Sequence, residues 1–299
     1  NKMKRNKLLD VLARTLFLTF FTIVDLRAEE SDKKELEMEM LSIFQKWSKA
    51  MNEGNLDTWQ QTTATFRKVG IRNMIVSQKK KWPESLFETQ VSPPKVDEMK
   101  KAKLMINGPT AQLVYFGKPN FGENEEVEVP EGLLFLMFVK EKEQWKFGTS
   151  RFMSLNNTEE ITAAAKSGDF SFLDSPQFRP PSKAPIIPKI SPIPELVGYI
   201  EIISIGYETR VKVEERSTHM VIDNVHKGLI LGGLKKGVNQ LFVEARELRG
   251  RPDKGKSKPH LEINVYKKSN LKKTPLKLLY STGKMKNGGK KKIIVRGDV

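Results

Sequence analysis

A proline-rich segment limits what this chain can fold into. Seven of the 16 prolines in the 299 residues lie between Pro176 and Pro194, in the sequence SPQFRPPSKAPIIPKISPIPE. Proline fixes φ and has no backbone N–H, so this density excludes regular helix or sheet and favours extended chain. We therefore predict a semi-rigid linker over 175–195 that separates two domains, and a chain of this length accommodates two hydrophobic cores.

Before the linker, the sequence predicts helices followed by strands in a domain over 33–174. Apolar residues recur every three or four positions between Asp32 and Asn52, which indicates one amphipathic helix. Gly54 is the expected end of that helix, and Asp57 is the expected cap of the next one. Four strands and a closing helix are then predicted at 101–106, 110–117, 132–140, 145–155 and 157–168.

After the linker, short strands at regular spacing predict an all-β domain over 196–299. Gly and Asn turns separate the β-branched and aromatic runs, which is typical of a β-sandwich. The expected strands are 197–206, 208–216, 219–225, 229–234, 239–248, 260–268, 276–282 and 291–297.

The stretch FQKWSKAMNEGNLDTW, from Phe44 to Trp59, carries a family resemblance. A long helix that ends in a Gly-Asn-Leu-Asp turn, with an aromatic residue opening the next helix, resembles the nuclear transport factor two-like superfamily, which includes SnoaL-like and ketosteroid-isomerase-like proteins. The resemblance covers about 33–155 and implies an α+β cone-shaped (cystatin-like) fold. It also implies a curved antiparallel sheet around the first helix, a conical cavity and often a homodimer through the sheet. The C-terminal domain resembles a generic Ig-like β-sandwich.

Catalytic residues do not follow from this resemblance. Family enzymes place an acid, a histidine or a tyrosine in the cavity, but this chain has no histidine before His219, and capping accounts for Asp57. Aromatic side chains could line a cone pocket, or they could simply form the core, which is the commoner role of aromatics at such spacing. The pocket candidates are Trp47, Trp59, Phe66, Tyr115, Phe135 and Trp145.

Charge is concentrated after the linker. From Lys183 onward, 25 Lys and Arg face 11 Asp and Glu, a net charge of +14 out of +16 for the whole chain. Such asymmetry indicates either an anionic partner or a solvated lysine-rich surface. The candidates for contact with an anionic polysaccharide or lipid surface are Arg249, Arg251, Lys254, Lys256, Lys258, Lys267, Lys268, Lys272 and Lys273. They lie in turns and strand ends.

The N-terminus predicts export. A basic start, the apolar run LFLTFFTIV and Ala28 before two acidic residues match a secretory signal peptide over 1–28. The apolar run is too short to span a bilayer, which needs about 20 residues. We therefore expect an exported bacterial protein, periplasmic or extracellular, that does not bind nucleic acid. The alternatives for 1–28 are an uncleaved signal anchor and an amphipathic first helix.

Metal and cofactor chemistry is not expected. The chain has no cysteine, which excludes disulfides, thiolate zinc sites and a cysteine nucleophile. His219, Asp223 and His226 lie close in sequence, but on a regular strand the first two share a face and His226 points to the other. The sequence thus predicts an exported, non-enzymatic binding or structural protein of the cell envelope that uses no cofactor and no metal. The alternative is small-molecule binding or an isomerase-like or hydrolase-like enzyme in the cone pocket.

Overall fold

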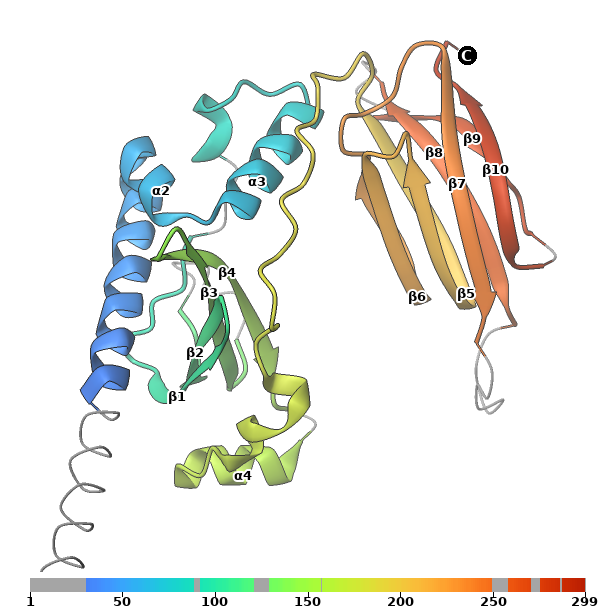
Figure 1. Cartoon of the computed structure of the whole chain (residues 1–299). Coiled ribbons are helices and arrows are strands. Elements are labelled where there is room, and N and C mark those ends of the chain that lie inside the picture. Colours follow the sequence, from blue (N-terminus) through green and yellow to red (C-terminus); the bar gives the residue numbers. More distant parts are fainter. Residues whose placement is uncertain are drawn as a thin grey trace, which may run out of the picture. The chain divides into compact units, whose positions relative to one another are not determined.

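The computed structural model describes residues 31–88, 92–120, 129–156, 158–248, 258–269, 275–285 and 287–298. Within these ranges the chain forms four α-helices and ten strands, so the fold is mixed and mostly β (Figure 1). All strand pairs are antiparallel. The expected signal peptide at 1–28 lies outside the described residues. In the described part of the chain, no helix has both the length and the apolar character of a membrane span.

The chain divides into two compact units. Unit 1 consists of Asn1–Ala64 and Val91–Pro185, and unit 2 consists of Thr65–Gln90 and Ile186–Val299. This division differs from the domain boundaries expected from the sequence. Residues 65–90 group with the C-terminal strands, and the proline-rich segment is shared between the units.

Unit 1 opens with the helix that the sequence predicts. It covers 31–53 and ends at Gly54, whose φ of 67° is left-handed and favours glycine. The next helix, α2, spans Leu56–Thr62. Its cap is Asn55, whose side chain accepts a 3.0 Å hydrogen bond from the Thr58 amide, so the prediction of Asp57 as the cap is wrong. Asp57 lies instead in the first turn, where its carboxylate interacts favourably with the positive end of the helix dipole.

A four-stranded sheet forms the centre of unit 1, in the order β1-β2-β3-β4. The strands are β1 Lys100–Asn107, β2 Thr110–Gly117, β3 Gly132–Glu141 and β4 Gln144–Ser154, which confirms the four predicted strands. Glu141 pairs with Gln144 across the β3–β4 hairpin. Most residues of β2 and β3 are buried because both faces of the sheet are covered.

The first helix packs on one face of this sheet through aromatic rings. The ring centroids of Trp47 and Phe147 lie 4.3 Å apart, and those of Phe44 and Phe147 lie 5.2 Å apart. Phe138 on β3 completes the contact, with its centroid 5.8 Å from that of Phe147. These rings account for the apolar positions that repeat along the helix.

The opposite face is covered by the segment that follows β4. It contains α4 Glu159–Ser167 and two 3-10 turns, η2 Ser171–Asp174 and η3 Pro176–Phe178. Phe178 stacks on Phe135 of β3 with 6.1 Å between ring centroids. The proline-rich segment therefore begins as a packed turn, contrary to the expectation of extended chain throughout.

Unit 2 contains a six-stranded antiparallel sheet built around one long strand. Its strands are β5 Gly198–Val213, β6 Ser217–Leu229, β7 Val238–Glu247, β8 His260–Lys268, β9 Leu276–Ser281 and β10 Gly289–Arg296. β5 pairs with β6 along both halves, with β8 through Gly198–Ile205 and with β7 through Tyr207–Val213. β9 extends the sheet from β8, and β10 extends it from β7.

Two strand predictions in unit 2 are wrong. The segments 197–206 and 208–216 form the single strand β5, which continues through Gly206 at a φ of 78°. The segment 229–234 is not a strand beyond Leu229; it is a loop in which Leu234 makes an isolated bridge to Leu196. Gly232 and Gly233 both have positive φ there, which bends the chain out of a strand.

Helix α3 spans Thr65–Ser77. Its side chains form hydrogen bonds with residues of unit 2 that follow more than 100 positions later in the sequence. The buried Asn73 side chain donates to the Lys189 carbonyl at 2.8 Å and accepts from the Ser191 amide at 2.8 Å. Ser77 Oγ accepts from the Gly232 amide at 2.7 Å. The short turn η1, Glu84–Leu86, follows α3. The second part of the proline-rich segment is therefore held against α3.

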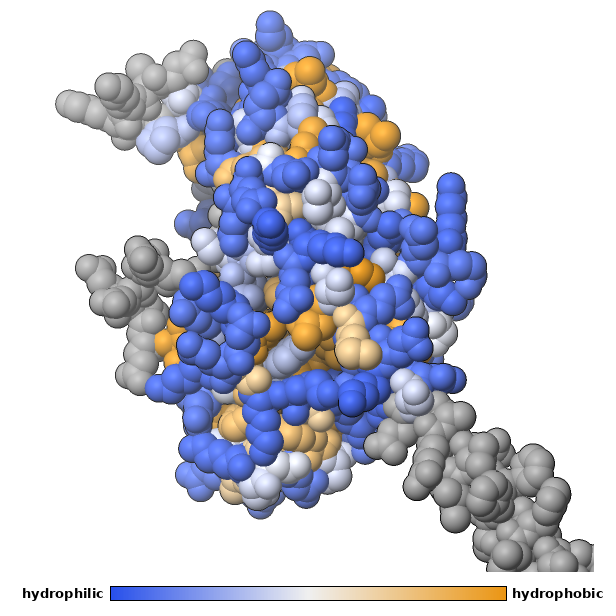
Figure 2. Space-filling model, turned by 90° about the vertical axis from the view of Figure 1, so that its left-hand side faces the viewer, coloured by the Kyte–Doolittle hydropathy of each residue, from blue (hydrophilic) through white to orange (hydrophobic). Residues whose placement is uncertain are grey.

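Hydrophilic side chains form most of the surface that Figure 2 shows, and hydrophobic ones appear in small patches between them. Charged residues make up 29% of the chain, so charge alone does not mark a site.

Candidate functional site

The six aromatic residues expected around a cone pocket do not gather at one place. Trp47 packs against Phe147 on the helix-covered face of the unit 1 sheet, whereas Phe135 packs against Phe178 on the opposite face. Trp59, Tyr115 and Trp145 are buried in unit 1, and Phe66 is half-buried on α3 in unit 2. None of the six lines any of the three cavities described below.

Tyr115 is the most perturbed titratable group in unit 1. Burial, together with the charges of Glu37 and Asp97, raises the pKa of its phenol to about 12. At neutral pH the phenol is protonated, so it is a proton or hydrogen-bond donor and a poor base. Glu37 is held by Lys101 at 2.5 Å, which fixes the carboxylate as part of the structure.

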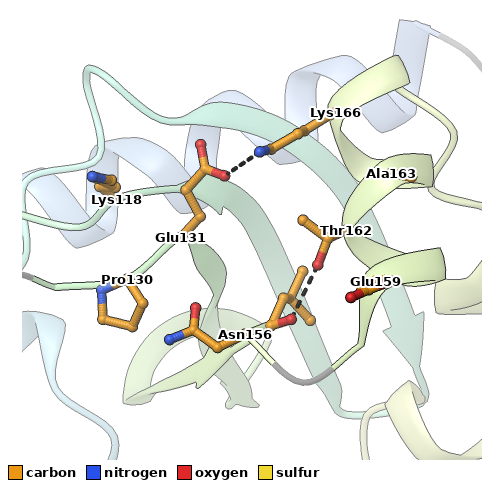
Figure 3. Close-up of a pocket in the computed structure, with 9 residues that line it drawn as sticks. Lys118, Pro130, Glu131, Asn156, Glu159, Thr162, Ala163 and Lys166 are labelled. Atoms are coloured by element: carbon orange, nitrogen blue, oxygen red, sulfur yellow. Dashed lines mark hydrogen bonds and ion pairs between the residues drawn. The ribbon is translucent and has the colours of Figure 1, made fainter.

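A cavity of about 770 Å³ lies between α4 and the neighbouring ends of β3 and β4 (Figure 3). Lys166 and Glu131 form a 2.9 Å ion pair across it, and the Thr162 hydroxyl donates to the Leu155 carbonyl at 3.1 Å. Its nine lining residues include no histidine, tyrosine or serine. Because Lys166 and Glu131 pair, their opposite charges at the rim of the cavity compensate each other. A further cavity of about 400 Å³ lies in unit 2, and one of about 350 Å³ lies beside β1.

Most of the basic residues expected to bind an anionic partner lie outside the described residues; these are Arg249, Arg251, Lys254, Lys256, Lys272 and Lys273. Lys258 and Lys268 are exposed. Lys267 is half-buried, and its ammonium donates to the Gly297 carbonyl at 3.1 Å. Of the nine predicted residues, the three that the structure describes are thus two exposed lysines, Lys258 and Lys268, and Lys267, which supports the end of the C-terminal strand.

A second set of cations, which the sequence analysis did not single out, lies on the outer side of the unit 2 sheet. Along β5, β7 and β10, alternate residues are buried, and the residues between them point away from the core. We call this outer surface the basic face. Its outward residues are the uncharged Val238, Gln240, Phe242 and Ile294 and the charged Glu208, Arg210, Lys212, Glu244, Arg246, Lys290, Lys292 and Arg296. Six cations and two carboxylates give it a net charge of +4.

The strand register sets these side chains in rows. Lys212, Phe242 and Lys292 are direct cross-strand neighbours on β5, β7 and β10. The Lys292 ammonium lies 5.7 Å from the centroid of the Phe242 ring, within reach of a cation–π contact. Arg210, Glu244 and Lys290 form the next row. An exposed aromatic ring thus lies between two lysines.

The two carboxylates of the basic face are already occupied. Glu208 binds Arg246 at 2.5 Å, and Glu244 binds Lys290 at 3.1 Å. The hydrogen bond from Lys290 is the main cause of the lowered pKa of Glu244. Among the described residues, Arg210, Lys212 and Arg296 have no ion-pair partner. The cavity of about 400 Å³ lies on this face and is lined by Arg210, Arg246 and Lys290 among others.

The other part of the same sheet has a different outer surface, which we call the network face. It comprises Glu201, Lys227, Glu262, Asn264, Tyr266 and Ser281 on β5, β6, β8 and β9. Glu201 accepts from the Tyr266 hydroxyl at 2.9 Å and from the Asn264 amide at 3.2 Å, and it pairs with Lys227 at 2.9 Å. The hydrogen bond from Lys227 is the largest cause of its lowered pKa.

The structure brings His219 and His226 together, so the prediction that they point to opposite faces is wrong. Asp223 has a φ of 44°, and the β5–β6 register shifts at this point. The shift reverses the alternation, so His219 pairs with buried Val211 and His226 pairs with buried Ile202. His219 Nδ1 lies 3.2 Å from His226 Nε2. Asp223 is not part of the contact, because its carboxylate accepts from the Gly206 amide at 2.9 Å.

No family model, curated protein or solved structure matches this chain. Within the described ranges, no group of three or more His, Cys, Asp or Glu side chains is placed to hold a metal ion.

Proposed function

We propose that this chain is an exported, non-enzymatic binding protein of the cell envelope, and that its basic C-terminal β-unit contacts anionic polymer or lipid surfaces. The export part rests on the signal-like sequence at 1–28, and the binding part rests on the basic face. Under this proposal, unit 1 is a scaffold.

The proposal also includes a fold type for each unit. The buried residues that alternate along β5, β7 and β8 join those of β6 and β10 in one core, which supports a sandwich-like packing for unit 2. A long helix packed on a four-stranded antiparallel sheet supports a cone-like unit 1. A homodimer through that sheet stays a prediction, and the chain's own α4, η2 and η3 cover part of the sheet face away from the helix.

The observation that carries the binding proposal is the arrangement of cations on the basic face. Neighbouring strands are about 4.8 Å apart, and alternate residues along a strand are about 6.8 Å apart. Arg210 and Lys212 therefore lie about 7 Å apart along β5, and Lys292 lies two strands, about 10 Å, from Lys212. Two carboxylates do not neutralise six cations, so this face attracts anions, and added salt weakens the attraction.

The alternative of an enzyme in the cone pocket has less support. Such an enzyme needs a desolvated acid, histidine or tyrosine that lines a cavity. Tyr115 is desolvated, but it lines none of the three cavities described above.

The test is a binding titration of the whole chain against four surfaces at low and physiological salt. These are an acidic polysaccharide, vesicles with anionic lipid, vesicles with neutral lipid, and duplex DNA. We expect salt-sensitive binding to the polysaccharide or the anionic vesicles, and the stronger of these identifies the partner class. Equal binding to anionic and neutral vesicles, or no binding to either anionic surface at low salt, would contradict the proposal.

A further inference from the structure

The His219–His226 pair has a geometry that suits more than a hydrogen bond. The two imidazoles come from the same strand, β6, and both point to the core side of unit 2. Their facing nitrogens, Nδ1 of His219 and Nε2 of His226, are 3.2 Å apart, and the ring centroids are 5.3 Å apart. Each ring therefore aims one nitrogen at the space between them.

This separation fits a shared metal ion. Zinc binds imidazole nitrogen at about 2.0–2.1 Å, and tetrahedral coordination places two ligand atoms roughly 3.3 Å apart. Imidazole is a preferred ligand of Zn²⁺, Cu²⁺ and Ni²⁺. The pair thus has the ligand type and the bite distance of half a tetrahedral site.

The surroundings of His219 orient its ring for this role. Ser217 Oγ lies 2.9 Å from His219 Nε2, and the same oxygen accepts a 3.1 Å hydrogen bond from the Leu231 amide. If Nε2–H donates to Ser217, the lone pair of Nδ1 faces His226. Metal-binding histidines are commonly oriented in this way through the second ring nitrogen.

Gly228 provides the space that the His226 ring occupies. A Cβ at this position would lie 2.5 Å from His226 Nε2 and 3.3 Å from His219 Cε1. Its φ is not in the left-handed region, so the backbone would accept alanine without strain. The absence of a side chain at Gly228 is therefore explained by the histidine pair and not by the backbone.

We propose that β6 carries a divalent transition-metal site in which His219 Nδ1 and His226 Nε2 are the protein ligands and water fills the remaining positions. His226 is partly exposed, which opens the site to solvent on its side. The ion replaces the hydrogen bond between the rings, so metal and proton compete for the same nitrogens. This site is independent of the basic face and of the proposed function.

The test is a titration of the metal-free whole chain with Zn²⁺ and with Cu²⁺, followed by calorimetry and, for Cu²⁺, by electron paramagnetic resonance. We expect saturation at one ion per chain and a signal typical of nitrogen ligands. His226→Gln should abolish this binding. Gly228→Ala keeps both histidines but displaces the ring, and it should weaken binding by roughly 10-fold or more.

His260→Gln is the matched control, because His260 bonds Glu262 at 3.0 Å on the network face and takes no part in the pair. It should bind the ions as the unaltered chain does. Thermal unfolding of each variant without metal shows whether it is folded. Absence of saturable binding in the unaltered chain, unchanged binding in folded His226→Gln, or loss of binding in His260→Gln would each overturn the site.

Discussion

The basic face and the network face lie on the same sheet of unit 2 and share strand β5, yet they treat charge differently. On the network face, Glu201 and Glu262 each bind several side chains, so charge is compensated inside the protein. On the basic face, Arg210 and Lys212 have no ion-pair partner among the described residues. The comparison suggests that the first surface stabilises the fold and that the second remains available for a partner.

The largest expected effect on stability comes from the network face. Glu201→Ala leaves the half-buried Tyr266 hydroxyl without its Glu201 acceptor. It also removes one of the two acceptors of the buried Asn264 amide, which keeps its 3.1 Å bond to Glu262. We expect a loss of about 2 kcal/mol in the free energy of unfolding, measured by urea denaturation, because lost acceptors of partly buried donors cost about 1–3 kcal/mol. The matched control is Glu208→Ala on the basic face. Its partner Arg246 is largely exposed, so we expect a loss below about 1 kcal/mol. Equal losses would remove the distinction between the faces.

The pH dependence of stability separates the histidine pair from the network face. Burial, and next the charge of His226, lowers the pKa of His219 from 6.5 to about 4. The unfolded chain thus takes up this proton at higher pH than the folded chain does. The contribution of neutral His219 to the free energy of unfolding is complete above pH 6.5. It is lost as the pH falls from 6.5 to 4, by an amount on the order of 2 kcal/mol.

Glu201 acts in a lower pH window. Its pKa is lowered from 4.5, so its contribution is present above pH 4.5 and is lost below that value. The free energy of unfolding should fall between pH 7 and pH 4.5 in the unaltered chain. His219→Gln should reduce this fall, and Glu201→Gln should leave it nearly unchanged. The opposite pattern would show that the network face, and not the histidine pair, controls stability near neutral pH.

The smallest expected effect concerns Phe242 on the basic face. Phe242→Ala removes the ring that holds the Lys292 ammonium in place on the basic face. An exposed cation–π contact is worth about 0.5–1 kcal/mol, so the loss of this positioning should weaken binding to the anionic surface by at most about 5-fold. Leu278→Ala is the matched control, because Leu278 is a half-exposed apolar residue beside Tyr266 on the network side. Equal binding by both variants would exclude a role for the ring.

The sequence predicts local structure in this chain well and long-range structure less well. The four strands of unit 1 follow from β-branched and aromatic runs between turns, and their bounds are confirmed within two residues. The attachment of α3 to unit 2 depends on Asn73 and Ser191, which are more than 100 residues apart, and no local pattern indicates such a pair.

The candidate sites were harder to predict for two physical reasons. The basic face combines β5 with β10, and alternation in TRVKV and KKIIVR could indicate exposed cations on each strand but not that β7 brings them together. The histidine pair depends on one bulge. Because side-chain direction has a period of two, a single residue with positive φ at Asp223 moves His226 to the side of His219.

The most direct test of the central claim compares two variants of equal charge. The first neutralises the basic face as Arg210→Gln, Lys212→Gln, Lys290→Gln and Lys292→Gln. The second neutralises four exposed lysines of the first helix of unit 1, as Lys33→Gln, Lys34→Gln, Lys46→Gln and Lys49→Gln. Each loses the same charge, and both are titrated against the anionic surface that the unaltered chain binds best, at low and physiological salt.

If the cations of the basic face bind the anionic surface, the basic-face variant should lose affinity by on the order of 10³-fold at low salt, since each Lys or Arg near an anionic surface contributes about 1 kcal/mol. This variant should also lose most of its salt dependence, while the helix variant should change little. Equal affinities for the two variants would contradict the account, because binding would then follow net charge and not the arrangement of cations on the unit 2 sheet.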